Sequence, residues 1–417
     1  MEEAAGWNLT PFEEAISKLD RMKSKPLDYE TIPTREAIGR ILAEDIVAER
    51  NVPDANLAFM DGYAIRAEDV QNASPEKPAT LKVVGKIYAG EATTIEISAG
   101  QTAKITHYAV MPSGATAIVP IEAIKVQEDI LTVKNPTREG MAILPAGADI
   151  KKGSLLLKKG HVMRPQDLAL LSDLKRPEVG VIKKPRVMVL SVGGDMVKMT
   201  EKSIIEDESG MAMLISKLLY DVGSIPISET VPDDVEALKE KFLSASQKVD
   251  IIITIGGLSV GEEDLVPQAL ESVGQLIMRG VAILPPWLTT FGTIKGKPIV
   301  CLPARYVPLI GTFYCFAMPL LSTLSGISTG TLLPTVKAKL SGDRGAPPGK
   351  YFFLTVNVKE AEGQFVAKPV FRGPHPISSL VEANGFIIIP AGKRIHDGEE
   401  VKVSLFSRIE LANLLAT

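Results

Sequence analysis

Cysteine, histidine and tryptophan are all scarce in this chain. Its 417 residues include two cysteines, four histidines and two tryptophans. Cys301 and Cys315 both lie in apolar stretches. Two such cysteines cannot build a disulfide scaffold, and they fit a reducing compartment, so we expect a cytoplasmic protein. The sequence also has no cluster of cysteines and histidines at the spacing of a zinc site.

The chain also lacks an excess of either charge. Lysine and arginine number 46 against 50 aspartates and glutamates, for a net charge of −4. No segment is basic enough to favour nucleic acid, and we expect no such partner. The N-terminal MEEAAGWNLTPFEEA has no apolar core and is not expected to be a signal peptide. The longest apolar stretch, FYCFAMPLLSTLSG, is expected to be too short and broken to span a membrane.

What remains is the composition of a soluble, multidomain protein. Apolar residues make up 45% and charged residues 23%, and the length allows two to four domains. TPFEEAISKLDRM predicts a helix in which Thr10 caps the N-terminus and Glu13 closes a capping box. A second helix is expected from Thr34 to the AEDI stretch. Residues 51–143 predict β structure, including TTIEIS, and residues 144–180 predict a return to helix.

From residue 185 strands and helices alternate. RVMVLSV, SIPISETV and VDIIITI predict strands, and the segments between and after them predict helices. Apolar strands separated by helices of this length indicate a parallel sheet covered on both faces. After about residue 330 the chain is again β-rich, which is consistent with a small barrel or sandwich.

The stretch VDIIITIGGLSVGEED places a glycine-rich turn at the end of a predicted strand, where open parallel sheets bind ligands. It has no Walker lysine. Its G-x-S-x-G pattern also fits a hydrolase elbow, with Ser259 as nucleophile and His375 or His396 as base. The three acids that follow oppose this, because they put negative charge where an oxyanion must be stabilised. Alternatively, the glycines only turn the chain and the acids cap the next helix.

This loop and four other motifs resemble the MoeA family, the molybdopterin molybdenumtransferases, which includes the E domain of gephyrin. They come in the family's order and spacing: AFMDGYAIR (58–66), SVGGDM (191–196), VPDD (231–234), GGLSVGEED (256–264) and CLPARY (301–306). The resemblance extends over nearly the whole chain.

The resemblance implies a MoeA-like fold, α/β plus β, in four domains. These would be a helical linker domain (1–50 and 144–180), an inserted β domain (51–143), a molybdopterin-binding three-layer α/β domain (181–329) and a C-terminal β barrel (330–417). It also implies a homodimer whose site lies in a cleft completed by the second subunit.

The implied function is molybdenum cofactor biosynthesis, in which molybdate or tungstate is inserted into adenylylated molybdopterin and AMP is released. Mg²⁺ would be the cofactor. The matching catalytic residues are Asp61, Asp195, Asp233 and Asp264, of which Asp195 and Asp264 would hold the metal. For Asp233, helix capping at VPDD is the alternative. The matching substrate-binding residues are Thr106, Gly256, Gly257, Ser259, Gly261, Pro303 and Arg305.

Four basic positions of the family are apolar here. Three lysines fall on Gly280, Leu284 and Trp287, and an arginine falls on Leu144. A carboxylate-rich cleft without these cations repels anionic substrates. The alternative is therefore a non-catalytic paralogue that binds a pterin nucleotide or a partner protein. If the rest of the site is intact, lysines at positions 284 and 287 should raise AMP release.

Two arginines and one tryptophan leave alternatives open. Arg279 and Arg305 could restore the lost charge, or they could be solvated surface residues. Trp287 could stack on a pterin or adenine ring, although filling the core is the more common role of such a residue.

Overall fold

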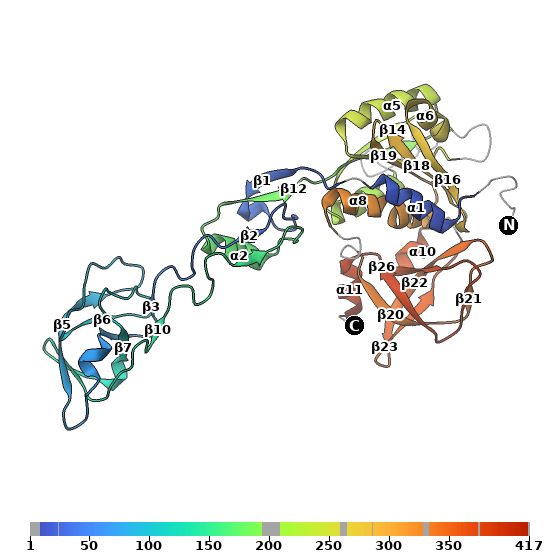
Figure 1. Cartoon of the computed structure of the whole chain (residues 1–417). Coiled ribbons are helices and arrows are strands. Elements are labelled where there is room, and N and C mark those ends of the chain that lie inside the picture. The colour runs from blue at the N-terminus through green and yellow to red at the C-terminus, as the bar shows by residue number, and fades with distance from the viewer. Residues whose placement is uncertain are drawn as a thin grey trace. The chain divides into compact units, whose positions relative to one another are not determined.

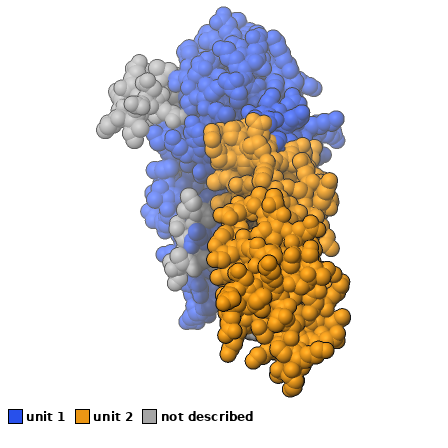
Figure 2. Space-filling model, turned by 90° about the vertical axis from the view of Figure 1, so that its left-hand side faces the viewer, with its two compact units in different colours: residues 1–31, 39–43, 180–417 blue, residues 32–38, 44–179 orange. Residues whose placement is uncertain are grey.

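The structure is a computed structural model that describes residues 9–23, 25–193, 209–258, 265–285, 287–327, 333–373 and 376–415. Its contacts divide the chain into two compact units, coloured separately in Figure 2. Unit 1 holds residues 1–31, 39–43 and 180–417, and unit 2 holds residues 32–38 and 44–179. The four domain boundaries given above stay a prediction.

A six-stranded sheet forms the centre of the α/β part of unit 1. Its strands lie in the order β14 (Ile225–Val231), β13 (Arg186–Val192), β15 (Ile251–Ile255), β19 (Lys297–Leu302), β18 (Trp287–Ile294) and β16 (Gln275–Val281). The first four are parallel, as predicted. β18 runs antiparallel to both of its neighbours, β19 and β16, so the sheet is mixed and β16 runs in the same direction as the first four. The tight turn at Lys295–Gly296 explains this, because both residues have positive φ and a two-residue hairpin reverses the chain.

Helices cover both faces of this sheet, which confirms the three-layer prediction. Val189 faces a core shared with α4 (Gly210–Asp221), whereas Leu190 faces a core shared with α5 (Val235–Lys248) and α6 (Leu265–Val273). Successive side chains of a strand point to opposite faces, so each strand supplies both cores. Figure 1 shows α5 and α6 on one side of the sheet and α1 and α8 on the other.

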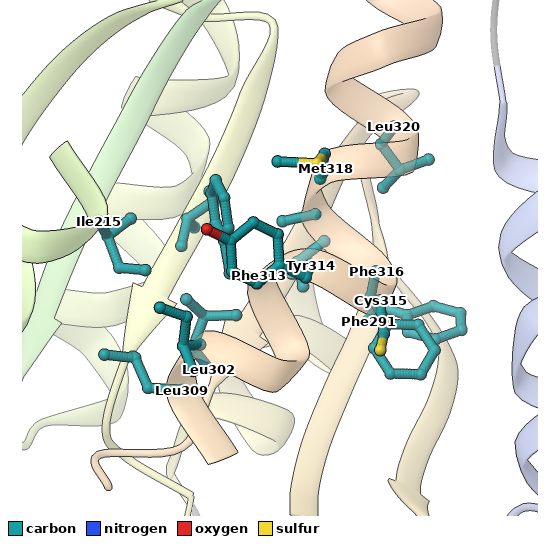
Figure 3. Packing of buried hydrophobic residues seen from close by; sticks show 14 of the residues in the cluster. Ile215, Phe291, Leu302, Leu309, Phe313, Tyr314, Cys315, Phe316, Met318 and Leu320 are labelled. Atoms are coloured by element: carbon teal, nitrogen blue, oxygen red, sulfur yellow. The ribbon is translucent and has the colours of Figure 1, made fainter. Parts of the chain in front are cut away.

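A long apolar helix lies in the first of these cores (Figure 3). It is built from α7 (Tyr306–Thr312), the π-helical turn η4 (Phe313–Ala317) and α8 (Met318–Ser325). The helix is longer than the apolar stretch FYCFAMPLLSTLSG that the sequence singled out, because it begins at Tyr306. Its 20 residues are long and apolar enough to cross a membrane, but 89% of its apolar window is buried inside the protein. It is therefore a core helix here.

Helix α1 (Phe12–Met22) confirms the first predicted helix and packs against the same core. The predicted capping by Thr10 was wrong, because Pro11 occupies the N-cap and makes no side-chain cap. Thr10 instead pairs with the end of β16. Its N–H donates to the Gly280 carbonyl at 3.1 Å, and its carbonyl accepts from the Ala282 N–H at 2.9 Å.

A closed barrel forms the C-terminal part of unit 1, which settles the barrel-or-sandwich alternative. Its strands lie in the order β22 (Tyr351–Ala361), β23 (Gln364–Pro369), β20 (Thr335–Leu340), β26 (Glu400–Leu405) and β24 (Gly385–Ile389), and β24 pairs back with β22. The short β17 (Ile283–Leu284) adds to β22 in parallel. The remaining elements are β21 (Arg344–Gly345), β25 (Arg394–Ile395), α10 (Ser378–Glu382) and α11 (Arg408–Leu415).

A second six-stranded sheet forms most of unit 2, as the β-rich pattern predicted. The order is β7 (Ala117–Pro120), β4 (Gly62–Ile65), β6 (Gln101–Ile105), β5 (Ala79–Ile87), β9 (Ile130–Val133) and β8 (Lys125–Gln127). TTIEIS was wrongly expected to be a strand, since it makes only an isolated bridge between Glu96 and Ser113. The short elements nearby are β3 (Leu57–Ala58), η2 (Ala67–Val70) and η3 (Ile121–Ala123).

Two predicted helical segments are mostly not helical. The helix expected from Thr34 is only the 3₁₀ turn η1 (Thr34–Glu36), because Gly39 at φ 71° ends it and Leu42 then bridges to Val181. Residues 144–180 contain one helix, α2 (Pro165–Asp173). Turns and short strands make up the rest. The strands in or beside these two segments are β1 (Tyr29–Pro33), β2 (Ile46–Val47), β10 (Ile143–Leu144), β11 (Leu155–Leu157) and β12 (Glu178–Ile182).

Candidate functional site

The strand order of unit 1 has a switch point between β13 and β15. From β13 the chain passes through α4 to β14 on one side, and α5 then carries it back to β15 on the other side of β13. Connections that leave in opposite directions open a crevice at the carboxyl ends of the two strands, where such sheets bind ligands. The residues at this edge are Gly193, after β13, and Gly256, after β15.

Two predicted substrate-binding glycines, Gly256 and Gly257, lie at this switch point, and both need to be glycine. Gly256 has φ +89°, and a Cβ there would lie 2.7 Å from the Val192 carbonyl oxygen. At Gly257, with φ +65°, a Cβ would lie 2.5 Å from the Val266 side chain. The loop after β15 therefore packs directly against the end of β13, which brings its backbone close to any ligand in the crevice.

Asp233 also lies at this edge, and its neighbour Asp234 caps the helix. The Asp234 carboxylate accepts from the Ala237 N–H at 2.8 Å at the start of α5. The Asp233 carboxylate is exposed and lies 3.0 Å from where a Cβ on Gly193 would stand. The capping alternative for Asp233 is thus wrong. The structure leaves this carboxylate available beside the end of β13.

The loop after β19 lies at the same edge of the sheet. Pro303 is buried, and Arg305 is exposed at the N-cap of α7. The Arg305 N–H donates to the Pro303 carbonyl at 2.9 Å. The Ala304 Cβ lies 3.8 Å from where a Cβ on Gly256 would stand, so the loops after β15 and β19 touch. A guanidinium here can reach an anion in the crevice.

Tyr306 is a feature of this edge that the sequence analysis missed. Its hydroxyl lies 3.1 Å from where a Cβ on Gly210 would stand, at the start of α4. The motif CLPARY contains this residue, but nothing in the sequence indicated that its hydroxyl faces the N-terminus of α4.

Asp61 and Thr106 belong to unit 2. Asp61 is exposed before β4, and its Oδ1 accepts from the His107 N–H at 2.8 Å. The Thr106 hydroxyl accepts from the Ala89 N–H at 2.9 Å. Gly62 must be glycine, because a Cβ there would lie 2.3 Å from a backbone oxygen of β7. The motif MDGYA therefore fixes Asp61 beside the turn that begins at Thr106.

Several predicted site residues lie outside the described residues: Asp195, Asp264, Ser259, Gly261 and His375. Within the described part of the chain, no three His, Cys, Asp or Glu side chains are grouped so that they could hold a metal ion. The predicted metal pair thus stays a prediction. His396, the other base considered for an elbow, lies in the barrel, with its ring 3.5 Å from the Asp343 carboxylate.

Two of the four positions at which the family has basic residues are closely packed here, and the other two are half-buried. Trp287 is 0% exposed, and its ring centroid lies 5.5 Å from that of Phe353. This confirms that Trp287 fills the core and does not stack on a ligand. A Cβ on Gly280 would lie 2.7 Å from Leu9. Leu284 is half-buried in β17, and so is Leu144 in β10. Arg279, in β16, is half-buried as well, so it is not a fully solvated surface arginine.

Comparisons with known proteins agree along the whole chain. Residues 10–174 match the MoeA N-terminal region (domains I and II), residues 188–323 a probable molybdopterin binding domain, and residues 337–406 the MoeA C-terminal region (domain IV).

Relatives and solved structures give the same result. A molybdopterin molybdenumtransferase of Haemophilus influenzae is 31% identical, covering 94% of this chain and 99% of that protein. A molybdopterin molybdenumtransferase of Bacillus subtilis is also 31% identical, and the match covers 95% of this chain and 94% of that protein. A molybdopterin biosynthesis MoeA protein of Pyrococcus horikosii superposes with a TM-score of 0.84 at 30% identity, covering 96% of this chain and all of that one.

Proposed function

Because this chain belongs to the MoeA family, which it matches over nearly its full length, we propose that it is a molybdopterin molybdenumtransferase in molybdenum cofactor biosynthesis. The observation that carries the proposal is the switch-point edge of unit 1, where Gly256, Asp233 and Arg305 are gathered. Two glycine-lined strand ends, an exposed carboxylate and an exposed guanidinium suit a substrate that is flat at one end and anionic at the other.

The substrate in this proposal is adenylylated molybdopterin. Water cleaves its pyrophosphate bond, so that one phosphate stays on molybdopterin and the other leaves as AMP. Molybdate or tungstate becomes bound to the dithiolene sulfurs, and the oxygen that they displace leaves as water. The tight turn at Gly256 and Gly257 lets the backbone approach the ligand closely. Arg305 would pair with phosphate or oxyanion oxygens through its planar fork of donors. Asp61, in unit 2, is proposed to serve the same reaction.

Mg²⁺ is the proposed cofactor. When bound, it would neutralise phosphate oxygens and so favour departure of AMP. The charge at this edge suits a hard cation, because the Asp233 carboxylate is exposed and does not cap α5. Asp195 and Asp264 are the proposed ligands of the metal.

A homodimer is also part of the proposal. The resemblance implies that a second subunit completes the cleft. Light scattering of the purified protein at micromolar concentration should therefore give twice the mass of one chain. A monomer would contradict this part of the proposal and leave the assignment to the family unaffected.

The test is molybdate-stimulated release of AMP, measured by liquid chromatography. Asp233→Asn should slow release by about 10²-fold, since it removes a proposed catalytic carboxylate from the edge. The matched control is Asp234→Ser, which removes the neighbouring acid but supplies a hydroxyl oxygen to cap α5, and it should release AMP at nearly the wild-type rate. Equal rates in the two variants would remove Asp233 from the mechanism.

A non-catalytic member of the family is the second candidate. It is favoured by the burial of Trp287 and by the close packing of Leu9 on Gly280, because neither position can present a cation to an anionic substrate. In that case the protein would bind AMP or a pterin phosphate and release no AMP from the adenylylated substrate, with or without molybdate.

A further inference from the structure

Three aromatic rings form an exposed cluster in unit 2, which we call the ring cluster: Phe59, His107 and Tyr108. The His107 and Tyr108 rings are stacked, with centroids 4.1 Å apart and planes 20° from parallel. Phe59 meets His107 edge to face at 6.1 Å. Phe59 and Tyr108 are each 55% exposed, so much of this aromatic surface is in contact with solvent.

The backbone under Tyr108 is in an unusual conformation. Thr106 to Ala109 form a tight turn, closed by the Ala109 N–H donating to the Thr106 carbonyl at 3.0 Å. Tyr108 has φ +62° in the second central position, where glycine is strongly preferred. A bulky residue with positive φ costs free energy, and such outliers cluster at functional sites. A tyrosine at this position therefore suggests that its ring has a functional role.

Asp61 ties this turn to the predicted site. Its Oδ1 accepts the N–H of His107, the residue whose ring stacks on Tyr108. Asp61 is exposed, so a ligand lying on the ring cluster meets a carboxylate at its edge. An exposed π-face beside a hydrogen-bond acceptor is complementary to a flat ring that carries N–H donors.

We propose that the His107–Tyr108 turn is a stacking platform for the planar nitrogen heterocycle of the substrate, either its adenine or its pterin. The proposal rests on the function proposed above, which supplies both rings. Tyr108 would lie against the ring face, and Asp61 would accept from a ring N–H or amino group. The sequence motifs assign no ring-binding role to Phe59, His107 or Tyr108.

The test measures binding by full-length protein of three probes in calorimetry: AMP, a pterin monophosphate and ribose 5-phosphate. Tyr108→Asn keeps a residue that tolerates positive φ but removes the ring. It should weaken binding of one ring-bearing probe by about 5- to 150-fold, the range for loss of one stacked base. Ribose 5-phosphate should bind equally to both proteins, and Tyr108→Phe should bind as the wild type does.

A second variant separates a binding role from a folding role. Tyr108→Gly suits the turn better, so it should melt at a higher temperature and still lose affinity for the ring. A purely structural tyrosine would instead give a lower melting temperature with affinity unchanged. Tyr29→Asn serves as the control for removing an exposed tyrosine elsewhere, since Tyr29 is 67% exposed in β1.

The results identify the ring and separate this proposal from the previous one. A loss confined to AMP assigns adenine, and a loss confined to the pterin probe assigns the pterin. Unchanged binding of both in Tyr108→Asn and Tyr108→Gly overturns the platform, even if AMP release is normal. Ring binding that depends on Tyr108 without any AMP release supports the platform and refutes the transferase.

Discussion

Trp287→Lys restores the amine that the resemblance to the MoeA family places at this position, and the structure predicts that it destabilises the protein. Trp287 is 0% exposed, with the rings of Phe353 and Phe316 at 5.5 and 6.5 Å. A Cβ on Gly311 would lie 2.3 Å from the indole, which shows how tightly the helix above it packs. A lysine at Trp287 is therefore expected to destabilise the core, and it would not reach the substrate to raise AMP release.

The expected loss has two parts. Truncating a fully buried tryptophan costs about 3–5 kcal/mol, and the lysine stem recovers only part of that. A buried ammonium without a partner adds a further penalty, which the lysine reduces by giving up its proton. We therefore expect the free energy of unfolding to fall by about 4 kcal/mol, which lowers the melting temperature by on the order of 8 °C for a protein of this size.

Differential scanning calorimetry measures this loss, and AMP release is measured on the same preparations. Trp287→Phe, which keeps a ring in the core, should lose much less stability. Leu284→Lys, at a half-buried position, should also lose less. Unchanged melting of Trp287→Lys together with faster AMP release would refute the reasoning, because it would show that residue 287 reaches the substrate.

Three further predictions follow from local contacts. Asp167→Asn should cost about 1–3 kcal/mol at pH 7, because Arg164 and neighbouring donors hold the pKa of this carboxyl well below its usual range. The difference from wild type in urea unfolding should shrink as pH falls below about 4, where the wild-type stabilisation is lost. Gly256→Ala should lower both melting temperature and AMP binding, whereas Gly392→Ala, with φ +70° in open space, should affect only stability. Burial raises the pKa of the Cys315 thiol to about 12, so a disulfide reagent at pH 8 should label it only after denaturation.

Much of the α/β part could be predicted because its signals are local. A continuous apolar run such as VDIIITI suits a strand buried on both faces, and the structure places it as β15. The antiparallel β18 was missed, because its direction depends on a hairpin whose signal is only Lys295–Gly296. The helix expected after Thr34 failed because tertiary pairing of Leu42 with Val181 overrides local helix propensity.

The sequence identified which residues lie at the candidate site better than it identified what each residue does there. Asp233 and Asp234 both precede α5, so either could have capped it, and only the contact to Ala237 assigns the cap to Asp234. Gly256 was expected at a ligand-binding strand end, and the switch point places it there. Tyr108 was missed, because a stacked ring at positive φ follows from the path of the turn, which composition and spacing do not show.

The molybdenum content of the pterin product tests the central claim most directly. Purified protein is incubated with adenylylated molybdopterin, Mg²⁺ and molybdate, and the released pterin is separated and analysed for metal by mass spectrometry. A molybdenumtransferase should yield one molybdenum per pterin and one AMP per molybdenum, with Asp233→Asn forming this product more slowly. Nucleotide binding without any molybdenum in the pterin would contradict the transferase and favour the non-catalytic member of the family.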